Sequence, residues 1–276
     1  MLKKLFIILT ILFSYTSANE KPTLGYLERL STVTKYDNSL KALNIVANDI
    51  LNEIGVDFNI KDYSDFDSIS KVYNNGEIDV ITLDLREYLK GFKKVDDNTS
   101  IYVTLPDMEN RRLDKLYLLV NKDSNINSLK DLKNKSLALR NGEILSQAYM
   151  NIIKKDNKLK YKNVKYFDNY NTIVLKTFFN NFDACIVPSG IYETIKELSP
   201  TIKTKLIILD KTENIYIPNI MLSNEKEKNN TINMVQKIKN NEKKEELFSL
   251  LSITDIFILE DYEVEKIKQF YLKSLK

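Results

Sequence analysis

Apolar residues recur along this chain in short β-favouring runs that alternate with helical periods. The clearest run, Leu116–Val120, ends at the polar cluster Asn121–Ser124 and predicts a strand followed by a turn. Strand character returns at Ser136–Arg140, and the loop Asn141–Gly142 then leads into the helical period of Ile144–Lys154. Free N–H groups at the start of that helix favour a negatively charged or strongly polar ligand.

The remaining segments alternate in the same way, which predicts an α/β architecture. Further strands are expected at Thr23–Leu27, at Val56–Ile60, in the apolar run after Asp79, in the apolar run after Asp183, and at Lys205–Leu209. Helices are expected at Leu40–Ile54, Phe66–Tyr73, Ile191–Leu198, Glu245–Leu251 and Tyr262–Leu275, with a charged, solvated helix within Asn224–Lys244.

The N-terminal segment Met1–Ala18 has the pattern of a cleavable export signal. Lys3 and Lys4 precede the apolar run Leu5–Phe13, and the small residues of Thr16–Ala18 form the expected cleavage site. The apolar run is short for a transmembrane span, so an uncleaved anchor is the weaker interpretation. We therefore expect an exported protein that works in the periplasm.

Composition removes several classes of function. The chain has 276 residues, 43% of them hydrophobic, with 41 basic and 38 acidic residues interspersed and a net charge of +3, so a nucleic-acid partner is not expected. It has no His and one Cys, Cys185, which excludes a His-assisted hydrolase and an internal disulfide. Cys185 lies in an apolar run and is expected to be a core residue. Neither a metal nor a cofactor is expected.

The segment Ser128–Lys135, Ser-Leu-Lys-Asp-Leu-Lys-Asn-Lys, resembles a known family. It is similar to the Ser-Leu-x-Asp-Leu-Lys-Gly-Lys of type II periplasmic solute-binding proteins, in particular the phosphate, phosphite and phosphonate branch of ABC-transporter receptors. Asn134 replaces the Gly of that pattern, and Asn tolerates the left-handed conformation better than most residues. A second signature of the family, a turn and an acid before a buried strand, occurs at Gly76–Leu83 and again at Asn180–Val187.

The resemblance implies a two-lobe α/β fold in which each lobe is a mixed sheet flanked by helices and a two-strand hinge joins the lobes. After a signal peptide at residues 1–18, lobe 1 would comprise residues 19–111 and 218–276, and lobe 2 residues 112–217. The ligand would bind in the cleft between the lobes, outside the carboxyl ends of the strands. We expect a monomer.

The candidate ligand-binding residues follow the strand ends and the loop before the predicted helix Ile144–Lys154. They are Tyr26, Arg29, Thr82, Asp84, Tyr88, Arg140, Asn141, Glu143, Ser146 and Ser189. Arg140 is suited to an oxyanion, although a surface ion pair with Glu143 is an equal alternative. Where phosphonate receptors carry a Ser-Thr-Ser-Gly-like run, this chain has Glu143-Ile144-Leu145-Ser146, and an acid there repels a dianion. Tyrosine faces with Glu143 and Asp84 would instead suit a cationic amine.

The function that the resemblance implies is capture of a small polar, phosphate- or phosphonate-like solute and its delivery to an ABC permease in the inner membrane. One alternative is a sensory receptor that presents its closed form to a membrane histidine kinase. The other is an enzyme on the same fold, for which Asp84 or Glu143 would be the carboxylate base. The export signal and the absence of His argue against an enzyme.

Overall fold

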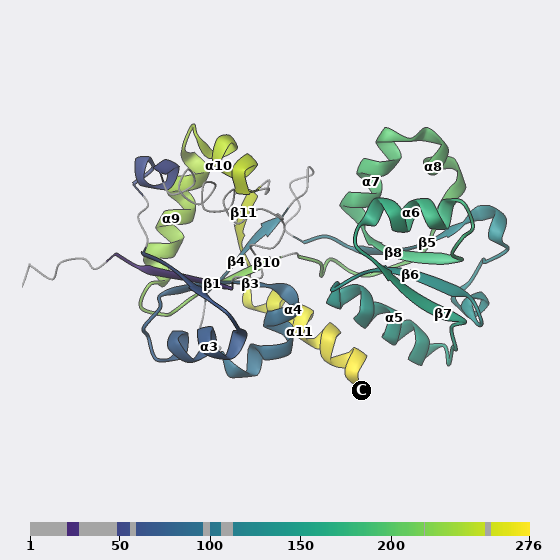
Figure 1. The fold of residues 1–276 in the computed structure, drawn as a ribbon, viewed down its shortest axis with the longest axis horizontal. Helices are drawn as coiled ribbons and strands as arrows, with labels where there is room; N and C mark the ends of the chain where they lie inside the picture. The colour runs from purple at the N-terminus through teal and green to yellow at the C-terminus, as the bar shows by residue number, and fades with distance from the viewer. Residues whose placement is uncertain are drawn as a thin grey trace, which may run out of the picture.

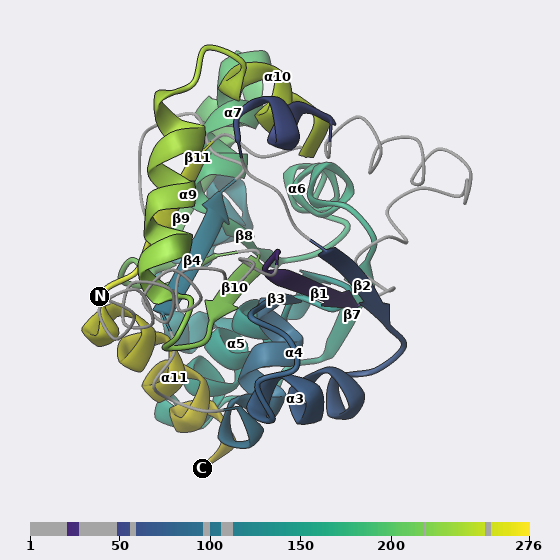
Figure 2. The same cartoon turned by 90° about the vertical axis from the view of Figure 1, so that its left-hand side faces the viewer.

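The computed structural model describes residues 21–27, 49–55, 59–95, 100–105, 113–217, 219–251 and 255–276. The predicted signal segment Met1–Ala18, the candidate ligand residue Arg29 and most of the predicted helix Leu40–Ile54 lie outside these ranges. The described chain forms two α/β lobes, each built on its own sheet (Figures 1 and 2). The end of the predicted helix before Gly55 is confirmed, because the helical turn stops there and Gly55 has a φ of 76°.

The first lobe is a six-stranded sheet with helices on both faces (Figure 2). Its strand order is β11-β4-β10-β3-β1-β2, in which β2, β1 and β3 run parallel and β10, β4 and β11 pair antiparallel. The strands are β1 (Thr23–Leu27), β2 (Asn59–Tyr63), β3 (Val80–Asp84), β4 (Ser100–Leu105), β10 (Asn219–Ser223) and β11 (Asp255–Ile258). The helices are α3 (Phe66–Asn74), α4 (Leu85–Gly91), α9 (Lys228–Asn240), α10 (Lys244–Leu251) and α11 (Asp261–Leu275).

The second lobe is a five-stranded mixed sheet in the order β7-β6-β8-β5-β9, with α5 on one face and α6, α7 and α8 on the other (Figure 1). Its strands are β5 (Leu116–Asn121), β6 (Ser136–Arg140), β7 (Asn163–Phe167), β8 (Ala184–Pro188) and β9 (Leu206–Lys211). Its helices are α5 (Ile144–Asp156), α6 (Tyr170–Phe178), α7 (Ser189–Leu198) and α8 (Pro200–Lys205). Two mixed sheets flanked by helices confirm the predicted α/β class.

The two acid-before-strand signatures hold equivalent positions in the two sheets. In the first lobe, Asp79 accepts a hydrogen bond of 2.7 Å from the N–H of Thr23, the first residue of the neighbouring β1. In the second, Asp183 accepts one of 2.7 Å from the N–H of Ser136, the first residue of β6, and another of 2.6 Å from its hydroxyl. Each acid therefore fixes the start of the parallel strand beside its own.

Two chain segments cross between the lobes and pair with each other. The backbone N–H of Asp114 donates to Tyr216 at 3.0 Å, and that of Tyr216 donates back to Asp114 at 2.9 Å. Next to this bridge, the N–H of Leu116 donates to the Thr212 hydroxyl at 2.9 Å. The two crossings are thus tied together where they leave the second sheet.

Helix α11 also contacts both lobes (Figure 1). The ammonium group of Lys268 lies 5.9 Å from the ring centroid of Tyr88 in α4, in the first lobe. The ring of Phe270 lies 6.3 Å from that of Tyr149 in α5, in the second lobe. The predicted lobe boundaries, after residues 111 and 217, remain a prediction, and α11 does not belong by contact to one lobe alone.

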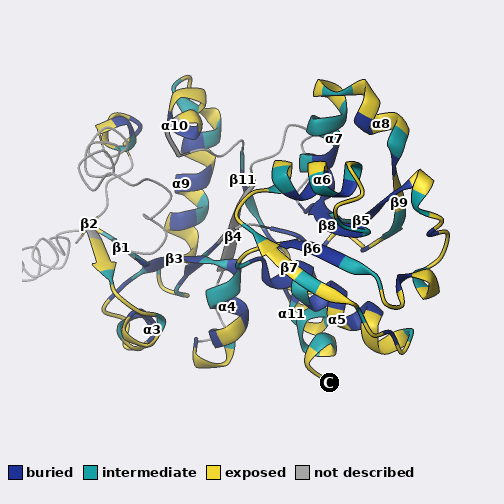
Figure 3. Cartoon of the chain, turned by 45° about the vertical axis from the view of Figure 1, so that its right-hand side comes forward, coloured by how far each residue is buried: buried dark blue, intermediate teal, exposed yellow. Residues whose placement is uncertain are grey.

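The apolar core runs through both sheets, and the buried strands β5, β6 and β8 carry most of it in the second lobe (Figure 3). The edge strand β7 escaped the sequence analysis because it lacks that apolar signal and is largely exposed. The predicted strand Val56–Ile60 ends too early, since β2 extends to Tyr63, and its first three residues lie outside the described ranges. Pairing with β1, up to Tyr63 opposite Leu27, carries β2 beyond its apolar pattern.

We predict that Asp183→Asn lowers the free energy of unfolding by about 1 kcal/mol near neutral pH, because its charge-assisted bonds to Ser136 become neutral ones. Burial alone would raise the pKa of Asp183, but the Ser136 bonds and Lys135 outweigh it, and the pKa lies below its ordinary value. The stabilisation is therefore present above the unfolded pKa, about 3.9, and is lost as the pH falls through the folded one.

Urea denaturation at several pH values tests this prediction, with Asp168→Asn, a change at an exposed acid of the same lobe, as the control. The Asp183 variant should approach the wild type at low pH, and the control should match it throughout. A loss that is independent of pH would contradict the prediction.

Candidate functional site

The loop that begins α5 is a tight turn from the end of β6. Arg140 is the last residue of β6, and the N–H of Asn141 donates to the carbonyl of Phe167 at 2.7 Å, which holds the loop against β7. Gly142 has a φ of 74°, a left-handed conformation that side chains rarely adopt, and Glu143 is the N-cap of α5. The predicted order of strand, loop and helix is confirmed.

Glu143, the N-cap of α5, is engaged by neighbours within the second lobe. The side chain is buried, with 8% of the residue exposed, and its carboxylate accepts hydrogen bonds from the N–H of Leu145 at 3.2 Å and from the hydroxyl of Tyr170 at 3.1 Å. Burial raises the pKa of Glu143, although these bonds and nearby Arg140 act in the opposite direction. The acid therefore caps α5 and occupies the N–H of Leu145, which an anion could otherwise bind.

Arg140 packs against an aromatic ring. Its guanidinium carbon lies 5.1 Å from the ring centroid of Tyr170, and the Tyr170 hydroxyl lies 3.5 Å from that of Tyr216, on the second crossing segment. Among the described residues no ion pair joins Arg140 and Glu143, so the alternative of a surface ion pair is wrong. Tyr170 stands between the two charges, and no local motif in the sequence signals that contact.

The two candidate serines are both fully buried. The Ser146 hydroxyl, in the first turn of α5, has no hydrogen-bond partner within the described part of the chain. The Ser189 hydroxyl donates to the carboxylate of Asp114, which also accepts the N–H of Gly190 at 2.8 Å. Asp114 thus caps the start of α7 from the first crossing segment, and the sequence analysis missed it.

The candidates of the first lobe gather around the carboxyl end of β3. Tyr26 in β1 lies opposite Thr82 in β3, and both are half-buried. Asp84 caps α4 by accepting the N–H of Glu87 at 2.6 Å. Tyr88 is buried, with 3% exposed, and packs against neighbouring side chains. The structure therefore brings Tyr26, Thr82 and Asp84 together near the carboxyl ends of β1 and β3, and it places Tyr88 in the core beside them.

Arg86, in the first turn of α4, reaches the loop of the other lobe and was also missed. Its Nη1 atom would lie 3.3 Å from a Cβ atom placed on Gly142. Its Nη2 atom lies 3.7 Å from Asp84 and 3.5 Å from Glu87. Arg86 lies two residues after Asp84, the cap at the end of the buried strand β3. A single arginine in a short charged helix is usually a surface residue, so the sequence alone does not identify Arg86 as a site residue.

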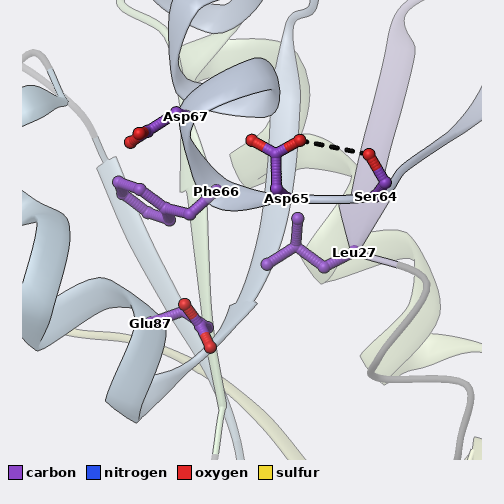
Figure 4. Close-up of a pocket in the computed structure, with 6 residues that line it drawn as sticks. All are labelled: Leu27, Ser64, Asp65, Phe66, Asp67 and Glu87. Atoms are coloured by element: carbon purple, nitrogen blue, oxygen red, sulfur yellow. Dashed lines mark hydrogen bonds between the residues drawn. The ribbon is translucent and has the colours of Figure 1, made fainter.

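A pocket of about 220 Å³ lies beside these residues at the carboxyl ends of β1 and β2 (Figure 4). It is lined by Leu27, Ser64, Asp65, Phe66, Asp67 and Glu87. Asp65 is held as the cap of α3, accepting the N–H of Ser68 at 2.8 Å and the hydroxyl of Ser64 at 3.1 Å. The pocket wall is acidic, and through Glu87 it adjoins Arg86.

Within the described ranges no cluster of three or more Cys, Asp or Glu residues has a geometry suited to a metal ion. The described helices also include none with the length and apolar character needed to cross a membrane.

A family model described as the periplasmic substrate-binding protein of phosphonate ABC transporters matches residues 32–256. The chain belongs to this family. The family is one of transporter receptors rather than enzymes, and it implies a periplasmic location, a small-molecule ligand and a permease partner. No protein of curated function has a significant sequence match to the chain.

Solved structures share the fold of this family member at low identity. A Xanthomonas citri protein solved with bound chloride is 14% identical, with a TM-score of 0.61 over 92% of this chain and 97% of the other. A binding protein component of an ABC phosphonate transporter from Pseudomonas aeruginosa is 14% identical, with a TM-score of 0.56 over 93% and 87%. PhnD1 from Prochlorococcus marinus, in complex with methylphosphonate, is 12% identical, with a TM-score of 0.56 over 91% and 97%. At these identities the likeness shows the fold alone.

We predict that Glu143→Gln stabilises the protein near neutral pH. The folded pKa of Glu143 is raised, so the wild type loses stability as the pH rises from the unfolded value of about 4.3 through the folded one. Gln keeps an acceptor for the Leu145 N–H and has no charge to bury.

Thermal unfolding at several pH values between about 4 and 8 measures this effect, with Glu197→Gln, a change at an exposed residue of α7, as the control. The advantage of the Glu143 variant should grow with rising pH. An advantage that grows toward low pH would show that the acid is stabilised as a carboxylate.

Proposed function

We propose that this chain captures a small polar solute, phosphate- or phosphonate-like, between its two lobes and delivers it to an ABC permease. The observation that carries the proposal is the approach of Arg86 in the first lobe to Gly142 in the second. That contact brings the carboxyl end of β3 and the start of α5 to one place, and in open α/β sheets ligands bind at such strand ends.

The paired crossing segments suit closure of the lobes around a ligand. The described parts of the two crossings, at Asp114–Leu116 and Thr212–Tyr216, are a few residues long, and hinge closure requires a few residues of this kind. A ligand that contacts both lobes would stabilise the closed form by its contacts with the second wall. No covalent chemistry is needed for this role.

The start of α5 can still accept an oxyanion despite Glu143. The carboxylate of Glu143 engages the N–H of Leu145 and leaves those of Ile144 and Ser146 unengaged by its cap. Burial, by raising the pKa of Glu143, also weakens the repulsion that an ionised acid would exert on an anion. A structural neighbour solved with methylphosphonate is consistent with such a ligand.

The remaining parts of the proposal concern the setting of the protein. Residues 1–18 direct export and are removed, so that the mature chain begins at Asn19 and works as a monomer in the periplasm. Transport is favoured over sensing for a membrane kinase, because the matching family is described as a component of ABC transporters.

The experiment that tests the proposal is a thermal-shift screen of the purified protein against phosphate, phosphonates, sulfonates, amines and amino acids. A ligand at 100 times its Kd stabilises the folded state by about 2.7 kcal/mol, which raises the Tm of a chain this long by roughly 5–10 °C. A shift with any small polar solute supports a receptor, and a shift with an oxyanion supports the phosphonate-like class. Failure of every compound would count against solute capture.

We predict that Arg140→Ala weakens binding of an oxyanion found in this screen by about 1.5–3 kcal/mol, the range for charge-assisted hydrogen bonds. Titration calorimetry measures the change. Lys154→Ala, which removes a positive charge from an exposed position of α5, is the matched control and should leave the Kd unchanged. If the wild type and the Arg140 variant bind the oxyanion with equal affinity, Arg140 is not a ligand residue and its role is packing on Tyr170.

A further inference from the structure

Arg86 lies beside two acids that are too distant to satisfy the hydrogen-bond donors of its guanidinium. Its Nη2 atom lies 3.7 Å from a carboxylate oxygen of Asp84 and 3.5 Å from one of Glu87, whereas charge-assisted hydrogen bonds are about 2.7–2.9 Å long. Its Nε atom is buried and has no hydrogen-bond partner among the described residues. A buried donor without a partner is costly, so the guanidinium retains unused hydrogen-bonding capacity.

The guanidinium is directed at the other lobe. Nη1 is the atom that comes closest to Gly142, in the loop where α5 begins. In the first turn of α5, the Ser146 hydroxyl is fully buried and also lacks a partner within the described chain. Each lobe therefore contributes one unsatisfied polar group near the start of this 13-residue helix.

We propose that Arg86 is the first lobe's specificity-determining residue, and that its guanidinium holds a singly charged oxyanion of the solute against the loop Arg140–Glu143. This inference rests on the proposed function and specifies the charge of its ligand: a singly charged oxyanion, which a singly ionised phosphonate, a sulfonate or a carboxylate supplies. The oxyanion supplies the acceptor that Asp84 and Glu87 are too distant to provide.

The charges around Arg86 select against a second negative charge on the ligand. Asp84, the N-cap of α4, and Glu87, in its first turn, flank the guanidinium of Arg86. These acids already oppose the charge of Arg86, so a dianion would meet more repulsion from them than a monoanion. Glycine at position 142 allows this close approach for two reasons. A Cβ atom there would lie 3.3 Å from Nη1 of Arg86, and the left-handed backbone conformation of residue 142 is one that side chains rarely adopt.

The test is calorimetric titration of the purified protein with methanesulfonate, acetate and methylphosphonate. The variants are Arg86→Ala and Arg86→Gln, with Lys90→Ala, a change at an exposed residue of the same helix, as the matched control. Loss of a charge-assisted contact should weaken binding by about 10- to 100-fold in both Arg86 variants. The control should stay within about twofold of the wild type, the scatter expected for a surface charge. Arg86→Gln keeps most of the side-chain volume and serves if Arg86→Ala fails to fold.

The outcomes separate this inference from the proposed function. Binding of methanesulfonate or acetate that falls in the Arg86 variants and not in Lys90→Ala supports it. Oxyanion binding that is equal in the Arg86 variants overturns the role of Arg86 and leaves the receptor function standing. If the wild type binds only amines or neutral solutes in the wider screen, the role of Arg86 is also overturned and the receptor function stands. Failure of the wild type to bind any compound, in this titration and in the wider screen, overturns both.

Discussion

The arrangement of the lobes depends most on the hydrogen bonds that the carboxylate of Asp114 accepts. This carboxylate sits on the first crossing segment, accepts hydrogen bonds from Ser189 and Gly190 at the start of α7, and belongs to the residue whose backbone pairs with Tyr216 on the second crossing. One buried acid thus joins both crossings to a helix of the second lobe. Its burial is tolerable only because these donors surround it. Loss of the carboxylate would leave the α7 start uncapped at the point where the lobes meet.

The same use of acids recurs throughout the protein. Asp79 and Asp183 fix the first residues of parallel strands, Asp65 and Asp84 cap helices, and Glu143 caps α5 while meeting Tyr170. Carboxylates here mostly satisfy backbone N–H groups, which are the donors that a strand or helix start leaves free. Two arginines at the meeting of the lobes are not closely paired with acids: Arg86 lies 3.5 Å or more from its two carboxylates, and Arg140 packs on Tyr170.

Sequence patterns predicted the elements whose signal is local. Thr23–Leu27 and Ser136–Arg140 match β1 and β6 residue for residue, because apolar runs bounded by turn residues determine buried strands. The edge strand β7 could not be found this way, since it is largely exposed and its limits follow from its pairing with β6. The site was harder for the same reason. Glu143 was a ligand candidate, and its hydrogen bond with Tyr170, 27 residues later, has no local signal. Arg86 gains meaning only from Gly142 in the other lobe.

Helix α11 limits how far the lobes can separate. Its Lys268 lies over Tyr88 of the first lobe while its Phe270 packs on α5 of the second, and only Leu259 and Glu260 connect it to β11. Opening of the lobes requires α11 to lose its contacts with one of them, because the helix packs on both. Separation of the lobes therefore costs the packing of the C-terminal helix as well as a change in the two crossing segments.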